Sequence, residues 1–346
     1  MPGRRADFAP LPLDRDAILD PVWLAEALDV VGDGDRVVAV DAVDSSRTIA
    51  EKIRFSVAVE AADGTQRTYP LCAKGHFEEG INSLHTEAAF YRHLRPALAV
   101  RAPRAYYTGL DLAARRGLIV MDDVVALGGT IGSAHEPYAV ATCRDSLGQL
   151  ALLHASTWGD EHRDVDWLAP RVALMADLFP TERLQGMLDD GRGPDLPPVL
   201  RDADTLKAAM QRTAEKPLTC VLHGDTHSGN SYRDAEGRSC WFDWQVTQCG
   251  HWSVDVAYHL GTVLTVDDRR AHERDLLTHY LAELDAHGAP APGFDDAWAA
   301  YASGFTWGYF LWAITSVSSR AVVLEHIPRL GAALTDHDTF GRLGVA

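Results

Sequence analysis

Two short segments of the chain, His223–Asn230 and Phe242–Gln245, contain the residues whose types and spacing could perform chemistry. Asp225 precedes Asn230 by five residues and Asp243 by eighteen. One carboxylate of such a set can accept the proton of an attacking hydroxyl group, while the amide oxygen and the other carboxylate hold Mg²⁺ against the phosphates of ATP. Because phosphoryl transfer depends mainly on positioning and charge neutralisation, these few side chains predict a phosphoryl-transfer site.

The surrounding sequence predicts how the first segment is held. Val221-Leu222 is apolar, so the loop with Asp225 is expected to leave a buried strand, and Gly224 and Gly229 reduce crowding around its polar groups. An Asp and an Asn at this spacing also occur in ordinary turns. The combination with His223, and with a second Asp at the end of an apolar strand, favours the functional interpretation.

A second chemistry fits the same loop locally, because Asp225-Thr226-His227 is an Asp-x-His sequence of the kind that holds two metal ions in metallophosphatases. Such enzymes also need a Gly-Asn-His and a Gly-His-x-His segment further along the chain. Neither occurs, since Gly250-His251 is followed by Trp252-Ser253. The sequence therefore favours transfer of a phosphoryl group from a nucleotide.

Predicted strands and helices divide the chain into a β-rich N-terminal part and a mainly helical C-terminal part. Alternating apolar residues with turn residues between them predict the strands, and apolar residues at helical spacing predict the helices. The fold class is therefore α+β, with a nucleotide-binding lobe at residues 1–123 and a helical lobe with the catalytic loop at residues 124–346. The predicted strands are Arg36–Val43, Ile49–Val59, Arg67–Lys74, Arg104–Leu110 and Gly117–Met121, and the predicted helices include Ser83–Leu94, Pro137–Thr157, Leu168–Asp189 and Asp202–Lys216.

The N-terminal part offers an independent test of this chemistry. A kinase-like site needs a cation on the ATP phosphates and a carboxylate from a helix that anchors the cation. Lys74 ends a predicted strand and Glu87 lies in the helix that follows it. A single Lys or Glu is usually a solvated surface charge. Their position upstream of the Asp225 segment favours a pair that belongs to the site.

With these residues in place, the chain resembles the aminoglycoside phosphotransferase and choline kinase superfamily, and within it the ecdysteroid-kinase-like branch of small-molecule kinases. The resemblance extends from about Val37 to about Gly331 and is strongest in the two segments named first. It implies a two-lobed, protein-kinase-like fold that binds ATP and Mg²⁺. The implied roles are a catalytic base (Asp225), magnesium ligands (Asn230 and Asp243), a phosphate-binding lysine (Lys74) and its helix glutamate (Glu87).

The resemblance also implies supporting positions. His223 would hold the catalytic loop, and Asp255 would brace this loop from the following helix. The segment Leu118–Val124 resembles the connection between the lobes, where adenine would bond to the backbone near Asp122 and Val124, with Met121 beside the ring.

One departure from the pattern concerns the loop that covers the phosphates in protein kinases, which is rich in glycine. The corresponding segment, Val43–Thr48, contains no glycine. The hydroxyl and backbone N–H groups of Ser45 and Ser46 are expected to contact phosphate instead. Gln245 stands where protein kinases have the glycine of Asp-Phe-Gly, and no activation-loop signature is present, so small-molecule substrates are expected.

Composition limits the partners and the compartment. The formal net charge of −17 disfavours nucleic acid as a partner. Five scattered cysteines without a CxxC pair disfavour a disulfide framework or a structural zinc site. No apolar run is long enough for a membrane span and the first residues are not a secretory signal. We therefore expect a cytoplasmic protein without a membrane partner.

An aromatic stripe near the C-terminal end bears on the acceptor. Five aromatic residues recur at helical spacing, which fits either a buried core or an apolar wall that faces the acceptor. The expected reaction is ATP- and Mg²⁺-dependent phosphorylation of a small-molecule hydroxyl group, with an apolar or ring-bearing alcohol as acceptor. The alternatives are an aminoglycoside or macrolide phosphotransferase, and a nucleotide-binding pseudokinase without turnover. The stripe consists of Trp298, Tyr301, Phe305, Tyr309 and Trp312.

Overall fold

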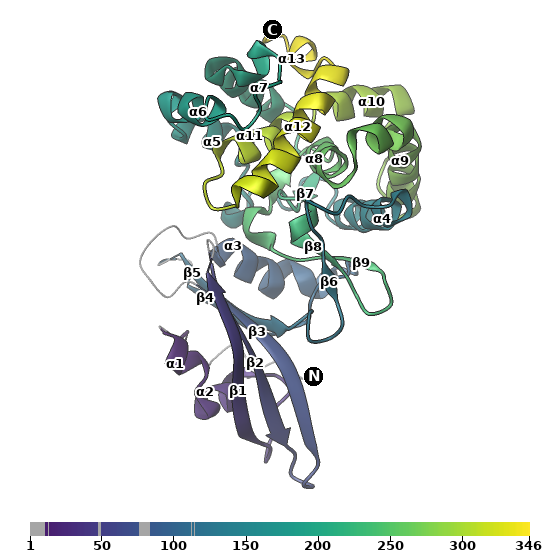
Figure 1. The fold of residues 1–346 in the computed structure, drawn as a ribbon. Coiled ribbons are helices and arrows are strands. Elements are labelled where there is room, and N and C mark those ends of the chain that lie inside the picture. Colours follow the sequence, from purple (N-terminus) through teal and green to yellow (C-terminus); the bar gives the residue numbers. More distant parts are fainter. Residues whose placement is uncertain (1–10, 13, 48–49, 76–83, 112, 114) are drawn as a thin grey trace.

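Five antiparallel strands form the sheet of the N-terminal lobe, in the order β1-β2-β3-β5-β4 (Figure 1). The computed structural model describes residues 11–12, 14–47, 50–75, 84–111, 113 and 115–346. The sheet precedes a larger helical lobe, so the predicted α+β fold is confirmed. The strands are β1 (Arg36–Arg47), β2 (Glu51–Glu60), β3 (Gln66–Gly75), β4 (Ala105–Asp111) and β5 (Arg116–Asp122).

The two faces of this sheet differ because side chains alternate along each strand. In β2, Ile53, Phe55 and Val57 are buried, and the residues between them are partly exposed. The buried face packs against two short helices, and this contact forms a hydrophobic core of its own. The opposite face carries Lys52 and Arg54. The two helices are α1 (Arg15–Ile18) and α2 (Pro21–Ala27).

Helix α3 (Leu84–Ala89) continues as a π-helical turn over Phe90–Leu94 and joins the sheet to the helical lobe. The ring of Phe90 stacks on Trp244 with 3.8 Å between ring centroids. Because Trp244 follows Asp243 directly, this stacking fixes the helix against the second motif. Residues from Leu84 onward confirm the predicted helix, whereas Ser83 lies outside the described residues.

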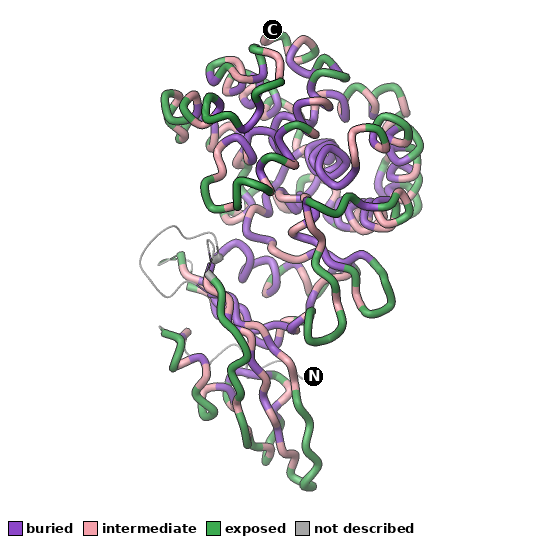
Figure 2. The backbone as a smooth tube through the Cα atoms, viewed as in Figure 1, coloured by how far each residue is buried: buried purple, intermediate pink, exposed green. Residues whose placement is uncertain are grey.

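The helical lobe is built around α8 (Ser253–Val263), in which all eleven residues are buried. Figure 2 shows this helix enclosed by the other helices of the lobe. Short strands carry the two motifs between the helices. The remaining elements are β6 (Thr130–Ile131), α4 (Val140–Ser156), α5 (Val172–Leu178), α6 (Thr181–Leu188), α7 (Ala203–Ala214), β7 (Cys220–Leu222), β8 (Ser231–Arg233), β9 (Ser239–Trp241), β10 (Gln248–Gly250), α9 (Val266–Ala286), α10 (Phe294–Ala302), α11 (Thr306–Ile314), α12 (Arg320–Asp336) and α13 (Thr339–Arg342).

Two predicted elements are corrected. The single helix predicted for Leu168–Asp189 is wrong, because Pro180 separates α5 from α6 and cannot continue a helix. The loop expected at Val43–Thr48 is also wrong, because the residues from Val43 to Arg47 belong to strand β1. Thr48 lies outside the described residues. Strand β5 ends at Asp122, beside the predicted lobe boundary. Within the described residues, no helix combines the length and the apolar character needed to cross a bilayer.

Candidate active site

The first motif forms a loop between β7 and β8. The Asp225 side chain is 23% exposed, so a substrate can reach it, and both of its oxygens accept hydrogen bonds. The Tyr258 hydroxyl donates to Oδ1 (2.8 Å) and Asn230 Nδ2 donates to Oδ2 (2.8 Å). Burial raises the pKa of Asp225, but His227 and the Tyr258 hydroxyl outweigh it and hold this pKa below the usual value. Asp225 is therefore ionised at neutral pH and able to accept a hydrogen bond from a hydroxyl group.

The amide of Asn230 is oriented by the same contacts. Its Nδ2 donates both to the Asp225 carboxylate and to the Asp225 backbone oxygen (3.0 Å). The Asn230 carbonyl oxygen consequently remains available as a ligand. An amide oxygen together with one carboxylate is a donor set that suits Mg²⁺, which completes its shell with phosphate and water oxygens. No group of three or more acidic, His or Cys side chains in the described part of the chain forms a metal site by itself.

Lys74 connects the two lobes. Its Nζ lies 2.7 Å from Glu87 Oε2 on α3 and 2.9 Å from Asp243 Oδ1 in the second motif. The ammonium group is almost fully buried, and its two carboxylate partners keep it charged by raising its pKa against the effect of burial. For Asp243, burial opposes ionisation, but Lys74 and Lys52 lower the pKa to about 2. The structure thus brings together three residues that lie far apart in the sequence.

Asp243 adopts an unusual backbone conformation. Its φ of +66° lies in the left-handed region, which is costly for a residue with a side chain. Gln245 Nε2 donates to Asp243 Oδ1 (2.7 Å) and helps to hold the carboxylate in place. The Asp243 carboxylate therefore faces Lys74 from a turn with a strained backbone, and contacts with neighbouring residues stabilise this conformation.

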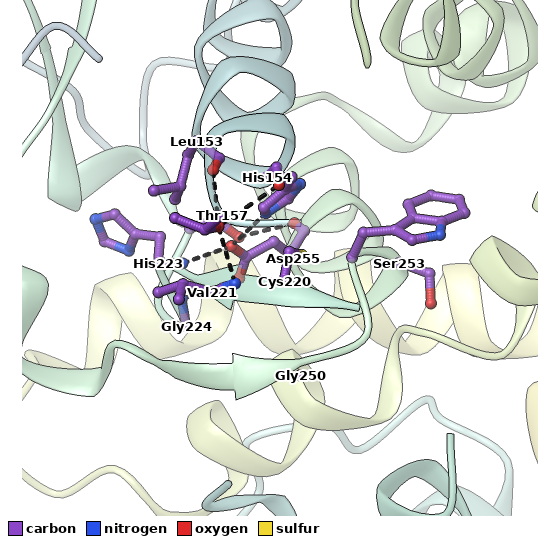
Figure 3. A network of polar contacts seen from close by, with 12 residues as sticks. Leu153, His154, Thr157, Cys220, Val221, His223, Gly224, Gly250, Ser253 and Asp255 are labelled. Carbon is purple, nitrogen blue, oxygen red and sulfur yellow. Dashed lines mark hydrogen bonds and ion pairs between the residues drawn. The ribbon is translucent and has the colours of Figure 1, made fainter. Parts of the chain in front are cut away.

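Asp255 braces the catalytic loop from the first turn of α8 (Figure 3). The backbone N–H groups of His223 and Gly224 donate to its two oxygens at 2.7 and 3.0 Å. His154 Nε2 lies 3.2 Å from the same carboxylate and orients it further. The loop lacks the regular backbone hydrogen bonds of a helix or strand. The Asp255 carboxylate holds it in place, because it is a buried acceptor for the first two N–H groups of the loop.

His223 links the two motifs. Its Nδ1 accepts from the Asp225 N–H (3.2 Å), so its Nε2 carries the proton and donates to the Phe242 backbone oxygen (3.0 Å). Burial lowers the pKa of His223, which keeps the ring neutral and this tautomer in place. Gly224 has a φ of +84°, and a Cβ there would lie 2.2 Å from the Val246 backbone oxygen, so glycine is required.

The predicted hinge, Leu118–Val124, consists of the end of β5 and the two residues after it. The Met121 side chain is buried in the main core. The Asp122 carboxylate accepts from the Tyr106 hydroxyl (2.8 Å) and the Arg104 N–H (2.9 Å). The Val124 backbone oxygen accepts from Gly129 (2.7 Å). Adenine binding along this segment stays a prediction.

The two serines of the predicted phosphate segment lie on opposite faces of the sheet. Ser45 pairs with Ile53, whose side chain belongs to the buried face, and Arg15 of α1 donates to the Ser45 hydroxyl (3.3 Å). Ser46 pairs with Lys52, and Lys52 pairs with Lys74. Of the two serines, only Ser46 therefore shares a face of the sheet with Lys74. Contact of the two hydroxyl groups with phosphate stays a prediction.

The aromatic stripe is mainly core. The Tyr301 hydroxyl donates to Glu273 (2.9 Å), and the Tyr309 hydroxyl donates to the Leu200 backbone oxygen (2.7 Å). Both contacts lie away from the motifs. Phe305 stacks on His337. Trp312 is the member of the stripe that approaches the catalytic loop, at 5.1 Å from the His227 ring. Of the two interpretations left open by the sequence, a buried core therefore applies to most of the stripe, and an apolar wall beside the loop applies to Trp312 alone.

Sequence reasoning did not assign a role to three residues that contact the site. Tyr258 and His227 flank Asp225, and Trp307 Nε1 donates to the Gly224 backbone oxygen (2.6 Å). Tyr258 could have been found, because it lies one helical turn after Asp255 and so shares its face of α8. Trp307 left no comparable local signal.

Removing the Tyr258 hydroxyl tests its effect on the Asp225 carboxylate. We expect Tyr258→Phe to raise the pKa of Asp225, because the lost hydrogen bond stabilises the ionised form. The acidic limb of the pH profile of ATP hydrolysis should move to higher pH, and the rate at pH 7.5 should fall less than about tenfold. Tyr309→Phe removes another buried hydroxyl, far from the site, and is the matched control. A profile that does not move would show that this bond leaves Asp225 unaffected.

Comparisons with known proteins agree with this geometry. A model of the phosphotransferase enzyme family matches residues 62–301, more than half of the chain. No curated protein matches the sequence. An ethanolamine kinase from Plasmodium vivax is similar in structure, with a TM-score of 0.52 and 10% identity over 94% of this chain and 88% of that one.

Two further solved structures show the same fold. A choline/ethanolamine kinase family protein from Mesorhizobium loti has a TM-score of 0.50 and 15% identity, over 89% of this chain and 92% of that one. A choline kinase from Streptococcus pneumoniae has a TM-score of 0.50 and 12% identity, over 87% of this chain and 94% of that one. These likenesses confirm the predicted kinase-like fold.

Proposed function

The chain belongs to the phosphotransferase enzyme family, and on this premise we propose that it transfers the γ-phosphoryl group of ATP, with Mg²⁺, to a hydroxyl group of a small molecule. The predicted superfamily and the predicted enzyme class, a phosphotransferase with an alcohol acceptor, are confirmed. Closeness to the ecdysteroid-kinase-like branch stays a prediction. The observation that carries the proposal is Lys74, which lies between Glu87 and Asp243 and joins the sheet to the catalytic loop.

In this mechanism each side chain has one task. Lys74 binds the ATP phosphates, and Glu87 keeps its ammonium group in position. The Asn230 carbonyl oxygen and the Asp243 carboxylate would hold Mg²⁺, which would supply positive charge to the phosphates. Asp225 accepts the hydrogen bond of the acceptor hydroxyl and takes its proton as the new P–O bond forms, while the bond between the γ-phosphorus and the bridging oxygen breaks and ADP leaves.

The proposed acceptor is a broader class of alcohol than the one that the sequence indicated. A ring-bearing alcohol is supported by the aromatic rings beside Asp225: the His227 ring lies near those of Tyr258 and Trp312, at 6.4 and 5.1 Å. Asp336, an acidic residue near the C-terminal end, bonds to Arg269 and Arg270 and is not available to bind a cationic antibiotic. An alcohol without several amino groups is therefore the favoured acceptor class.

Slow ATP hydrolysis distinguishes an enzyme from a silent nucleotide-binding protein. We expect the purified protein to release phosphate from Mg·ATP without an acceptor, because water can take the place of the hydroxyl group. EDTA should abolish the release, and Asp243→Asn should reduce it at least a hundredfold by weakening the metal site. Asp267→Asn, a change at an exposed carboxylate on α9, is the control. Tight ATP binding with no release under any condition would favour the pseudokinase.

A further inference from the structure

We propose that Lys52 is a second phosphate-binding cation of the nucleotide site and takes over part of the task of a glycine-rich loop. The proposal rests on the proposed function, since it assumes that ATP phosphates lie at Lys74. No sequence motif indicated Lys52, because strand pairing sets the position of this residue in the site.

The register of the sheet places Lys52 beside Lys74. Ser46 of β1, Lys52 of β2 and Lys74 of β3 are directly paired across the three strands. Side chains of directly paired residues point to the same face of a sheet. The neighbouring residue of β2, Ile53, is buried in the core with α1 and α2, so Lys52 points to the opposite face. This is the face from which Lys74 reaches Glu87 and Asp243.

Two cations in directly opposite positions repel each other and destabilise a sheet unless anions compensate them. Lys74 has two carboxylates within 3 Å. Lys52, by contrast, has no carboxylate within ion-pair distance among the described residues. Its direct pairing with Lys74 across β2 and β3 places it beside the site. Lys52 thus lies beside the site, and none of the described carboxylates is paired with its ammonium group.

The other cation of this strand is already engaged. Arg54 lies two residues along β2 on the same face, and its Nε donates to Asp123 Oδ2 (2.8 Å). This ion pair ties β2 to the segment after β5. Lys52 is therefore the cation of β2 that can turn to a ligand. Lysine suits this task, because it is a compact point charge on a flexible stem.

The negative charge of the site explains why a second cation would help to bind phosphate. Lys74 is shared between Glu87 and Asp243, and Asp225 adds a further negative charge. A triphosphate carries more negative charge than one Mg²⁺ and one shared lysine neutralise. Without Lys52, the phosphates would enter a site with surplus negative charge.

The backbone N–H groups at the end of β1, in the described part of the glycine-free segment, contribute little to phosphate binding. β1 remains paired with β2 as far as Arg47, so its N–H groups follow a strand and do not form a cradle for phosphate. The Ser45 N–H donates to Asp44 Oδ1 (2.7 Å) and is consumed by a side chain of its own segment. A cationic side chain in the same row as Ser46 supplies the charge that these N–H groups do not.

Calorimetric titration with Mg·ATP, Mg·ADP and adenosine tests the inference. Lys52→Met keeps most of the apolar stem and removes the charge, and Lys52→Arg retains the charge. We expect Lys52→Met to weaken Mg·ATP binding about tenfold, the loss of one charge-assisted contact, and Mg·ADP binding less. Adenosine binding should not change, Lys52→Arg should restore most of the loss, and the salt dependence of Mg·ATP binding should be smaller in Lys52→Met.

Arg67→Met is the matched control, because Arg67 is an exposed cation of β3 near the opposite end of the strand from Lys74. Equal Mg·ATP affinity of wild type and Lys52→Met would overturn the inference and leave the proposed function intact. An equal loss for adenosine and Mg·ATP would also overturn it, since a structural role would then explain the effect. If wild type itself does not bind Mg·ATP, the proposed function fails and the inference fails with it.

Discussion

Asp225→Asn is expected to lower turnover by a factor of about 10² to 10⁴, the range lost when a general base is removed. Asp225 is the ionised, solvent-reachable carboxylate of the site, and its two oxygens are held by Tyr258 and Asn230. An amide cannot take the proton of the attacking hydroxyl group. Binding of Mg·ATP, measured by calorimetry, should change less than about threefold, because the lost step follows binding.

A second variant guards against an indirect effect. In Asp225→Asn an amide NH₂ group can face the Asn230 NH₂ group, which could turn the Asn230 side chain and disturb a metal ligand. Asp225→Ala removes the base without a competing donor and should show the same loss of turnover. Asp267→Asn, on the exposed surface of α9, should leave the rate unchanged. A wild-type rate in both Asp225 variants would contradict the role of this residue.

Lys74→Met is expected to cause the largest loss of stability as well as a loss of activity. It leaves the buried Glu87 carboxylate without its cation, and breaking a buried pair by removing one partner typically costs about 3–5 kcal/mol. Adding Glu87→Gln removes the stranded charge and should return most of the free energy of unfolding. Activity should stay lost in both variants, because neither can bind phosphate through Lys74. Chemical denaturation and ATP hydrolysis measure the two effects separately.

The same variant has an expected pH dependence. Burial raises the pKa of Glu87, and Lys74→Met removes the cation that opposes this effect most strongly. A carboxyl group whose folded pKa lies above its unfolded value supports the fold when it is protonated and loses this support as the pH rises through the folded pKa. Lys74→Met should therefore be more destabilised at pH 8 than at pH 5, which lies just above the ordinary pKa of a glutamate, and the double variant should not show this trend. A pH-independent loss would indicate that Glu87 is not the source of the instability.

The catalytic segment could be predicted from sequence because its information is local. Asp225 and Asn230 lie in one loop between two short strands, so their spacing along the chain already limits their distance in space. The same holds for Asp243, which follows an apolar strand. Lys74 and Glu87 were also expected together, since a strand and the helix after it usually pack against each other. The predicted α+β fold followed from the same local periodicity.

One predicted helix was wrong although its signal was present in the sequence, and the faces of two serines could not be predicted because they depend on pairing between strands. The helix predicted for Leu168–Asp189 missed the effect of Pro180, although that signal was available. The faces of Ser45 and Ser46 depend on the register of β1 against β2, and a shift by one residue would exchange them. The lobe boundary near residue 123, the cytoplasmic location and the expected absence of nucleic-acid partners stay predictions.

By itself, the sequence determined which residues are candidates for the chemistry: a predicted base, two predicted metal ligands and a lysine–glutamate pair in the order expected of a two-lobed phosphotransferase. Only the tertiary structure decided that Lys74 meets Asp243, that the aromatic residues from Tyr301 to Tyr309 face the core, and that Lys52 stands beside Lys74. The physical reason is the range of the interactions. Turn geometry and strand alternation are fixed by neighbours along the chain, whereas sheet register and helix packing are fixed by the burial of apolar surface across the whole molecule.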